Sequence, residues 1–267
     1  MNALGHKGTP PPHVCAAFGG SAPPRLLDGG AGRTWRCGDV MCKPVGDVAE
    51  SIWRAEVLDT LPESPHVRLA RPVRTSDGAW TCDGWEAWLP VDGEPDPSRL
   101  ADVRWAGTEF HTLVATLPRP AFLDTRNDRW TFGDHVAFGE TAVPTDGPWA
   151  EPLRRLAAAR RPLALPNQPV HGDLLGNVLF APGAAPAIID WPVYFRPAAW
   201  ADAVAVVDAV VWYGARPAVL EPADIAPDIW RQSLIRALMY RMATNVAGGH
   251  ERPDDYRAVL DVVIDEV

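Results

Sequence analysis

Short runs in which apolar and polar residues alternate fill the chain between Arg25 and Leu89, and this period of two predicts β-strands. The runs are Arg25–Leu27, Thr34–Cys37, Val40–Val45, Val67–Arg74 and Ala79–Leu89. One intervening stretch, Asp47–Leu61, instead repeats its apolar residues at helical spacing and begins with an aspartate suited to cap a helix. We therefore expect a small sheet with one helix in this part of the chain.

Beyond Pro90 the pattern becomes helical, after a segment in which Pro, Asp and Gly are frequent. The helical stretches are Pro97–Thr116, Glu151–Arg160, Ala198–Tyr213, Asp228–Val246 and Asp254–Asp265. Residues Phe122–Glu140 lack this period and are expected to form an irregular loop at the entrance to a substrate site. The chain is thus predicted to be an α+β protein with two lobes, residues 1–90, of which 1–24 form a loosely ordered start, and residues 91–267.

Two short apolar runs separated by turn residues lie within VHGDLLGNVLFAPGAAPAIIDW, the stretch from Val170 to Trp191. Val178–Phe180 and Ala187–Ile189 are expected to pair as a β-hairpin, because the Pro, Gly and Ala residues between them favour a turn. If the turn centres on Gly183 and Ala184, an antiparallel register places Phe180 opposite Ala187.

In that register Asn177 lies opposite Asp190, and side chains so placed have Cβ atoms roughly 4.5–5.5 Å apart. An amide oxygen and a carboxylate at this separation can hold a hard cation, which prefers oxygen ligands. Asp173 precedes the first strand and is expected at the mouth of the same site. A base together with two metal ligands is the set of groups used in phosphoryl transfer.

The composition is that of a globular protein, with 47% hydrophobic and 22% charged residues. The net charge is −9 and Lys and Arg form no cluster, which argues against a nucleic-acid partner. No apolar run is long enough to cross a membrane and no N-terminal signal is evident, so we expect a cytoplasmic protein without a membrane partner. Cys15, Cys37, Cys42 and Cys82 match neither a disulfide framework nor a zinc-ligand pattern and are expected to be buried thiols.

Glycine is concentrated at Gly29, Gly30 and Gly32, between the first two predicted strands. A loop without side chains lets backbone N–H groups approach an anion, and a strand–loop–strand arrangement can cover a phosphate. An ordinary turn is the competing and more common explanation of such a cluster. Lys43, in the third predicted strand, is a candidate to bind the α- and β-phosphates of a nucleotide, although strand lysines at sheet edges are usually only solvated.

A phosphate-binding lysine is normally oriented by a carboxylate, and the predicted helix offers two. Glu56 shares the face of Ile52 and Trp53 by helical spacing, and a carboxylate on an apolar face needs a partner. Glu56 is therefore the preferred partner of Lys43, with Glu50 as the alternative.

The end of the last predicted strand, Glu86–Gly93, is expected to be an extended hinge between the lobes. Backbone groups of Ala87 and Leu89 are candidates to hydrogen-bond to the edge of an adenine ring. Trp85 or Trp88 would wall that pocket, but both tryptophans are at least as well explained as core or rim residues.

This order of glycine loop, strand lysine, helix glutamate, hinge and His-x-Asp motif resembles the aminoglycoside phosphotransferase family of the protein-kinase-like fold. His-Gly-Asp-Leu at 171–174 and Ile-Ile-Asp-Trp at 188–191 look like the two signature motifs of that family, and an actinobacterial-type subgroup is the closer likeness. The resemblance implies a two-lobed fold, with an antiparallel-sheet lobe and a larger helical lobe. It also implies an ATP- and Mg²⁺-dependent kinase that phosphorylates a hydroxyl group of a small molecule.

By the same resemblance, Asp173 is the catalytic base and Asn177 and Asp190 bind Mg²⁺. Lys43 and the glycine loop bind the ATP phosphates, and His171 braces the loop structurally. Catalysis would then be mainly positional and electrostatic.

One departure from the family pattern lies between the base and the first metal ligand. Three residues, Leu174, Leu175 and Gly176, separate Asp173 from Asn177 where the family usually has four. Gly176 can adopt backbone angles that absorb the difference. The alternative function is a pseudokinase or nucleotide-binding interaction module that binds without turnover. The sequence specifies neither the acceptor nor the oligomeric state, and the negative net charge gives only weak support for a cationic acceptor.

Overall fold

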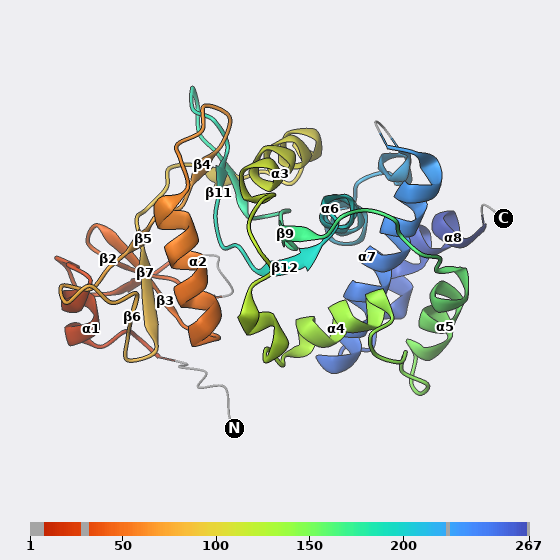
Figure 1. Ribbon diagram of the computed structural model, residues 1–267, viewed down its shortest axis with the longest axis horizontal. Helices are drawn as coiled ribbons and strands as arrows, with labels where there is room; N and C mark the ends of the chain where they lie inside the picture. Colours follow the sequence, from red (N-terminus) through yellow and green to blue (C-terminus); the bar gives the residue numbers. More distant parts are fainter. Residues whose placement is uncertain (1–7, 28–31, 223–224, 266–267) are drawn as a thin grey trace. The chain divides into compact units, whose positions relative to one another are not determined.

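The computed structural model describes residues 8–27, 32–222 and 225–265. The chain divides into two compact units (Figure 1), residues 1–94 with 179–193, and residues 95–178 with 194–267. The sequence placed the boundary after Pro90 and assigned all later residues to the second lobe. The structure instead gives residues 179–193 to the first unit, because strand β11 (Ala187–Ile188) pairs in parallel with β4 (Arg68–Leu69).

An antiparallel sheet is the centre of the first unit, with strand order β1-β2-β3-β7-β5 and β6 also paired to β7. The strands are β1 (Arg25–Leu26), β2 (Trp35–Cys37), β3 (Val40–Pro44), β5 (Pro72–Val73), β6 (Thr81–Cys82) and β7 (Trp85–Trp88). Two predicted strands are each divided in the structure. Val67–Arg74 contributes β4 to one sheet and β5 to another, and Ala79–Leu89 turns at Asp83 and Gly84, which both have positive φ.

Two helices flank this sheet, α1 (Pro12–Ala17) and α2 (Val48–Thr60). Cys42 and Ala87 face each other across β3 and β7, and both pack with α1 in one apolar cluster. The neighbouring pair, Lys43 and Glu86, points to the opposite face by strand alternation, and there Arg54 of α2 contacts Glu86. The sheet therefore has an apolar face under α1 and an ionic face under α2.

A smaller sheet has the order β4-β11-β10-β8, with β8 at Glu94–Pro95 and β10 at Val178–Phe180. Strands β10 and β11 are the two predicted arms of the hairpin, and their adjacency confirms the pairing expected from the sequence. A third sheet joins β9 (Gln168–His171) and β12 (Val193–Arg196), neither of which the sequence predicted.

The second unit is mainly helical and packs around α7, which is buried along most of its length. Its helices are α3 (Leu100–Val114), α4 (Arg129–Phe138), α5 (Ala150–Ala159), α6 (Ala198–Tyr213), α7 (Pro227–Ala247) and α8 (Arg257–Asp265), with short 3₁₀ turns at Ala121–Asp124, Pro217–Leu220 and Pro253–Tyr256. The mixed α+β class predicted from the sequence is confirmed, with an antiparallel sheet early in the chain and helices later.

The predicted irregular loop at Phe122–Glu140 is wrong, because most of it forms α4. Asp128 caps this helix by accepting a hydrogen bond from the Thr131 N–H, and Gly139 ends it with φ +78°. The helix packs closely on α7 through Gly133, where a Cβ atom would lie 2.6 Å from the carbonyl oxygen of Tyr240. Small and polar residues make this contact, so the apolar periodicity that usually reveals a helix is absent.

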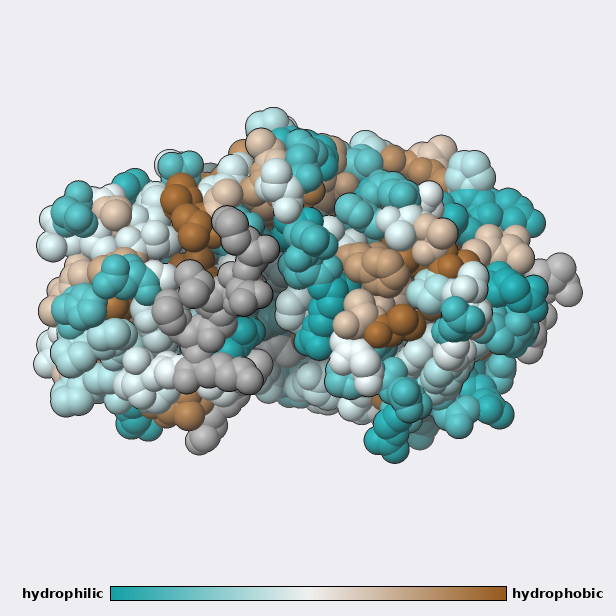
Figure 2. Space-filling model, turned by 90° about the horizontal axis from the view of Figure 1, so that it is seen from below, coloured by the Kyte–Doolittle hydropathy of each residue, from teal (hydrophilic) through white to brown (hydrophobic). Residues whose placement is uncertain are grey.

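Large apolar side chains are exposed to solvent singly or in small groups, as the brown areas among teal residues in Figure 2 illustrate. The most exposed of them include Leu26, Val48 and Leu89 in the first unit and Trp105, Trp212 and Tyr213 in the second. Among the described residues, every helix is too short or too polar to cross a membrane.

Candidate active site

Lys43 and Asp190 form an ion pair within the first unit, with 3.1 Å between Nζ and Oδ1. Lys43 lies on the ionic face of β3, and Asp190 follows β11. The backbone of Asp190 has φ +53°, which is uncommon for a residue with a side chain. The lysine side chain is 19% exposed and the aspartate side chain 47%, so the carboxylate has an open side. The residues predicted to bind phosphate and Mg²⁺ are therefore neighbours.

The structure corrects the predicted pairing of Lys43 with Glu56. The buried residues of α2 are Ser51, Ala55 and Leu58, and Glu56 lies on the exposed side of the helix. Glu50, the alternative partner, is directed inward, but its Oε1 accepts a hydrogen bond of 3.1 Å from the Val193 N–H. The partner of Lys43 comes from the segment after β11 and not from the helix.

Arg54, which the sequence did not single out, is the central cation of the ionic face. Its Nη2 donates to both carboxylate oxygens of Glu86, at 2.8 and 2.9 Å, and Nη1 donates to the Trp191 carbonyl oxygen at 3.2 Å. Burial alone lowers the pKa of Arg54, but the carboxylates of Glu86, Glu50 and Asp190 outweigh it and raise that pKa above its usual value. Helix α2 thus holds the backbone that follows Asp190.

The predicted glycine loop is only partly described. Gly29 and Gly30 lie outside the described residues, whereas Gly32 has φ +67° and its Cβ position is open. That conformation suits a glycine, but it does not distinguish a phosphate loop from a turn.

The predicted hinge contacts are not available at Ala87. This residue lies in β7 between Cys42 of β3 and Val73 of β5, so the backbone groups of Ala87 face a paired strand. The N–H of Leu89 donates to the Arg71 carbonyl oxygen at 2.8 Å, and the side chain of Leu89 is half-exposed. A contact between an adenine edge and the carbonyl oxygen of Leu89 stays a prediction.

In the second unit, Asp173 is held through both of its carboxylate oxygens. Arg241 Nη2 donates to Oδ1 at 2.7 Å, and Asn177 Nδ2 lies 3.3 Å from Oδ2. The same Nδ2 donates to the carbonyl oxygen of Asp173 at 2.6 Å, which closes the shortened loop on itself. Gly176 has φ +92°, the kind of backbone conformation by which a glycine can absorb one missing residue.

The amide nitrogen of Asn177 faces Asp173, so Oδ1 is the atom of this side chain that can ligate a metal. Asn177 belongs to the second unit and Asp190 to the first. A Mg²⁺ ion shared by the two residues therefore stays a prediction.

Arg241 is itself anchored by Asp208 of α6, and both side chains are almost completely buried. Arg241 Nε donates to Asp208 Oδ1 at 2.8 Å, Nη2 contacts Oδ2, and the guanidinium lies 4.9 Å from the centre of the Trp212 ring. Burial raises the pKa of Asp208 to about 6 even though Arg241 opposes the shift, so Asp208 is ionised at neutral pH. This buried pair fixes the guanidinium that orients Asp173.

His171 links the end of β9 to the turn that carries Asp173. It is fully buried, its backbone N–H donates to His111 Nε2 at 3.1 Å, and its Nδ1 accepts from the Asp173 N–H at 3.2 Å. Burial lowers the pKa of His111 to about 3, with a smaller contribution from His171, which keeps the accepting ring neutral. His171 is thus held on both sides.

Two half-exposed aromatic residues at the end of α6, Trp212 and Tyr213, flank this site. Trp212 packs on Arg241, and the Tyr213 hydroxyl lies 3.4 Å from the position a Cβ would take at Gly176. No motif or spacing in the sequence pointed to a role for Arg241 or for these aromatics. A usable signal was the arginine itself, because a charged residue within the apolar run of α7 needs a buried partner.

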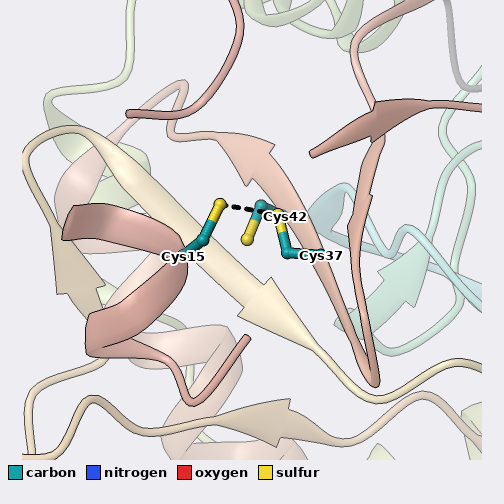
Figure 3. A group of neighbouring side chains, drawn as sticks. All are labelled: Cys15, Cys37 and Cys42. Carbon is teal, nitrogen blue, oxygen red and sulfur yellow. Dashed lines mark hydrogen bonds between the residues drawn. The ribbon is translucent and has the colours of Figure 1, made fainter. Parts of the chain in front are cut away.

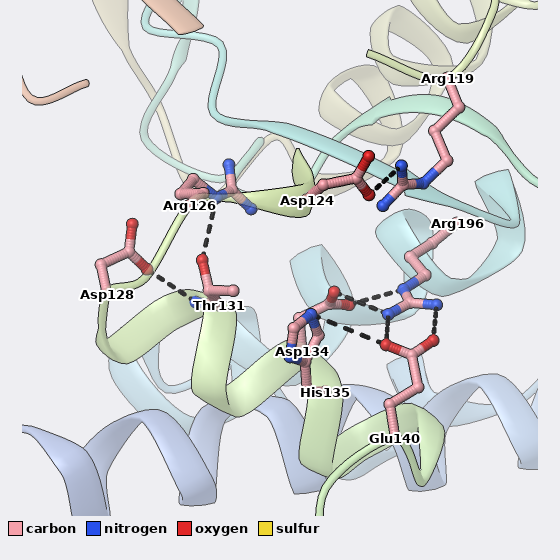
Figure 4. Close-up of polar contacts among 9 residues, drawn as sticks. All are labelled: Arg119, Asp124, Arg126, Asp128, Thr131, Asp134, His135, Glu140 and Arg196. Carbon is pink, nitrogen blue, oxygen red and sulfur yellow. Dashed lines mark hydrogen bonds and ion pairs between the residues drawn. The ribbon is translucent and has the colours of Figure 1, made fainter. Parts of the chain in front are cut away.

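The acidic residues within 122–140, the segment expected at the entrance to a substrate site, already have partners (Figure 4). Arg196 forms paired hydrogen bonds with both Asp134 and Glu140 over 2.6–2.8 Å. Asp134, His135 and Glu140 are spaced closely enough to bind a metal, but the guanidinium of Arg196 already neutralises the two carboxylates. This cluster ties β12 to α4.

The chain is similar to known proteins in structure and not in sequence. No protein-family model matches the chain, and no curated protein matches its sequence. An aminoglycoside phosphotransferase from Alicyclobacillus acidocaldarius has a TM-score of 0.54 at 16% identity, covering 98% of this chain and 95% of its own. A spectinomycin phosphotransferase bound to AMP has a TM-score of 0.59 at 10% identity, covering 95% and 96%. Choline kinase from Streptococcus pneumoniae has a TM-score of 0.53 at 11% identity, covering 91% and 92%.

The chain has the fold of the aminoglycoside phosphotransferases. The protein-kinase-like fold expected from the two sequence motifs is thereby confirmed. The aminoglycoside phosphotransferase fold agrees with the observed order of an antiparallel sheet with helix α2 followed by a helical unit. The three solved proteins named above are small-molecule kinases.

Proposed function

We propose that this protein is an ATP- and Mg²⁺-dependent kinase that transfers a phosphoryl group to a hydroxyl of a small molecule. The observation that carries the proposal is the 3.1 Å contact between Lys43 and Asp190. It brings a cation able to bind phosphate next to a carboxylate able to bind a metal ion, although the two residues are far apart in the sequence. Phosphoryl transfer relies on such charges because its transition state spreads negative charge over the phosphoryl oxygens.

The available donor atoms suit Mg²⁺, which prefers oxygen ligands. Asp190 would contribute its carboxylate and Asn177 its amide oxygen. When bound, Mg²⁺ neutralises charge on the nucleotide phosphates. Lys43 would bind the phosphates from the ionic face of β3, and Arg54 would keep the backbone next to Asp190 in place.

In the second unit, Asp173 would orient the acceptor hydroxyl and receive its proton. Arg241 and Asn177 fix its two oxygens, so the carboxylate is pre-oriented. Trp212 and Tyr213 present aromatic surface beside it, and we expect the acceptor to contact these rings. Aromatic surface suits the apolar face of a sugar ring or an alkylammonium group.

The first test is thermal stability of the purified full-length protein with and without ATP and Mg²⁺. A ligand at about 100 times its Kd should stabilise the protein by about 2.7 kcal/mol. The Asp190→Asn variant should lose the Mg²⁺-dependent part of the shift, whereas Asp59→Asn, a matched change at an exposed ion pair of the first unit, should keep it. Equal melting temperatures with and without millimolar ATP–Mg²⁺ would reject the proposal.

The second test is transfer of the γ-phosphoryl group to a panel of hydroxyl compounds. Solved structures with this fold include kinases of spectinomycin, amicoumacin and choline, so these compounds and related amino sugars form the first panel. A protein that binds ATP–Mg²⁺ but transfers phosphate to no acceptor, water included, would favour the nucleotide-binding module over the kinase.

A further inference from the structure

Three of the four cysteines meet on the apolar face of the first unit's sheet, beneath α1. Cys15 comes from α1, Cys37 from β2 and Cys42 from β3, and their sulfur atoms all lie within 4.8 Å of one another (Figure 3). The Sγ atoms of Cys15 and Cys37 are in hydrogen-bonding contact at 2.7 Å. The site is thus assembled from three separate elements and has no part in the proposed kinase chemistry.

The surroundings of these thiols are apolar. Their buried neighbours in the cluster are Val14, Phe18, Val40, Trp85 and Ala87, and Cys82 packs against the same cluster from a partly buried position. Cys37 and Cys42 have no exposed surface, and Cys15 is 4% exposed. Burial raises the pKa of Cys15 to about 12 and those of Cys37 and Cys42 to about 11, so all three are neutral thiols in the folded protein.

Metal binding and disulfide formation are the two reactions that such a cluster can support. Two cysteine sulfurs bound at about 2.3 Å to one tetrahedral zinc ion are about 3.8 Å apart, so Cys15 and Cys37 would have to separate. Three thiolates on one divalent ion would also bury a net negative charge, and the described members of this cluster include no cation. A disulfide has sulfurs about 2.05 Å apart and is neutral, so contact distance and apolar surroundings both favour it.

We propose that Cys15 and Cys37 form an oxidisable dithiol site whose reagent is a low-molecular-weight disulfide, and that oxidation joins α1 covalently to β2. The thiolate of Cys15 attacks the reagent, which forms a mixed disulfide and releases one thiolate. The thiolate of Cys37 then attacks the Cys15 sulfur, which forms the Cys15–Cys37 bond and releases the second thiolate. Two electrons pass to the reagent, and its two thiolates take up the two protons that the cysteines lose.

Local detachment of α1 gives the reagent access to these buried sulfurs. The helix has six residues and no side-chain cap at its first turn, and helices this short are marginal without tertiary contacts. Among the described residues, its polar contacts include an exposed pair between His13 and Asp83 and a backbone hydrogen bond from Ser76 to Ala17. Because Cys15 is on the element that moves, it is the thiol that reacts first.

The test uses the full-length protein in buffers of reduced and oxidised glutathione at fixed ratios, quenched by alkylation and read by mass spectrometry. We expect a species that is about 2 Da lighter, with two cysteines protected from alkylation, and a linked peptide pair that contains Cys15 and Cys37. We also expect the oxidised protein to melt several degrees higher, because the bond restricts the unfolded chain. Addition of a dithiol reductant should reverse the change in mass.

Two variants make the assignment specific without depending on the melting temperature. Cys37→Ala should abolish the lighter species and stop at a glutathione adduct on Cys15, whereas Cys82→Ala, the matched change outside the triad, should leave the species unchanged. Four thiols that stay free in the most oxidising buffer would overturn the proposal. A linked Cys37–Cys42 pair, or a metal ion that co-purifies with the native protein in stoichiometric amount and is lost in Cys37→Ala, would overturn it as well.

Discussion

In each unit a largely buried arginine holds one of the two aspartates predicted to act in catalysis. Arg54 contacts the backbone next to Asp190, whereas Arg241 contacts the carboxylate of Asp173. In the first unit, Arg54 is anchored on Glu86 and donates a hydrogen bond to the carbonyl oxygen of Trp191, the residue after Asp190. In the second unit, Arg241 is anchored on Asp208 and donates a hydrogen bond to the carboxylate of Asp173 itself. In both cases a buried carboxylate from another element fixes the guanidinium.

The difference matches the chemistry proposed for each aspartate. A contact to the backbone does not engage the carboxylate of Asp190, whose side chain pairs with Lys43 and is 47% exposed. Contacts to the carboxylate itself, as at Asp173, fix the orientation in which its two oxygens face a substrate. The first arrangement suits the metal ligand that we propose for Asp190, and the second suits the base that we propose for Asp173.

The largest expected effect separates the two aspartates by function. Asp173→Asn should lower kcat by about 10²- to 10⁴-fold, the usual contribution of a general base, and should keep the stabilisation by ATP–Mg²⁺. Asp190→Asn should lose both transfer and Mg²⁺-dependent stabilisation. Steady-state kinetics and melting curves on the same preparations provide the measurement, with the exposed Asp124→Asn as control. Loss of Mg²⁺-dependent stabilisation in Asp173→Asn would contradict this division of roles.

The next effect concerns stability in the second unit. Arg241→Met should cost about 3–5 kcal/mol in the free energy of unfolding, because it leaves Asp208 buried without its partner. Arg241→Met combined with Asp208→Leu should recover most of that loss, and kcat should remain low because Asp173 is no longer aimed. Urea unfolding measures both variants. A double variant as unstable as the single one would show that the buried pair is not what Arg241 contributes.

A smaller effect is expected at the matching arginine of the first unit. Arg54→Met should cost about 3 kcal/mol, at the lower end of the range for a broken buried pair, because Glu86 keeps a hydrogen bond from the Trp88 indole. The comparison predicts a raised KM for ATP–Mg²⁺ with little change in kcat, since Asp173 is untouched. A fall in kcat at unchanged KM would contradict the proposal that Arg54 supports binding of ATP–Mg²⁺ and only Arg241 supports the catalytic base.

The effect that is smallest near neutral pH is a pH dependence that resides in the second unit. The pKa of His111 falls from its usual 6.5 to about 3 on folding, so the unfolded chain binds a proton between these pH values that the folded chain does not. Stability from this residue is therefore complete above pH 6.5 and is lost as the pH falls towards 3, by at most about 1.4 kcal/mol per pH unit. His111→Gln, which offers an acceptor to His171 without titrating, should flatten urea-unfolding stability across that window.

Local patterns in the sequence were sufficient to predict an element wherever its formation depends on residues that are close together in the chain. The prediction of a helix at Ala198–Tyr213 matches α6 residue for residue, and Asp47 caps α2 as expected. The hairpin strands β10 and β11 were also located correctly from their apolar runs and the turn between them. In each case the signal lies within a few residues of the element, and so a periodicity or a capping residue can reveal it.

The sequence by itself therefore determined the class of the protein, its main elements and the aspartates at which chemistry is expected. Only the tertiary structure decided which charges meet: Lys43 with Asp190 in place of Glu56, and Asp173 with Arg241. It also decided that α4 exists. This helix packs closely on α7 at Gly133, and its sequence has no apolar periodicity from which a helix could be predicted. The physical reason is that secondary structure follows from short-range spacing, whereas the partner of a buried charge is whichever opposite charge the packed chain brings within a few ångströms.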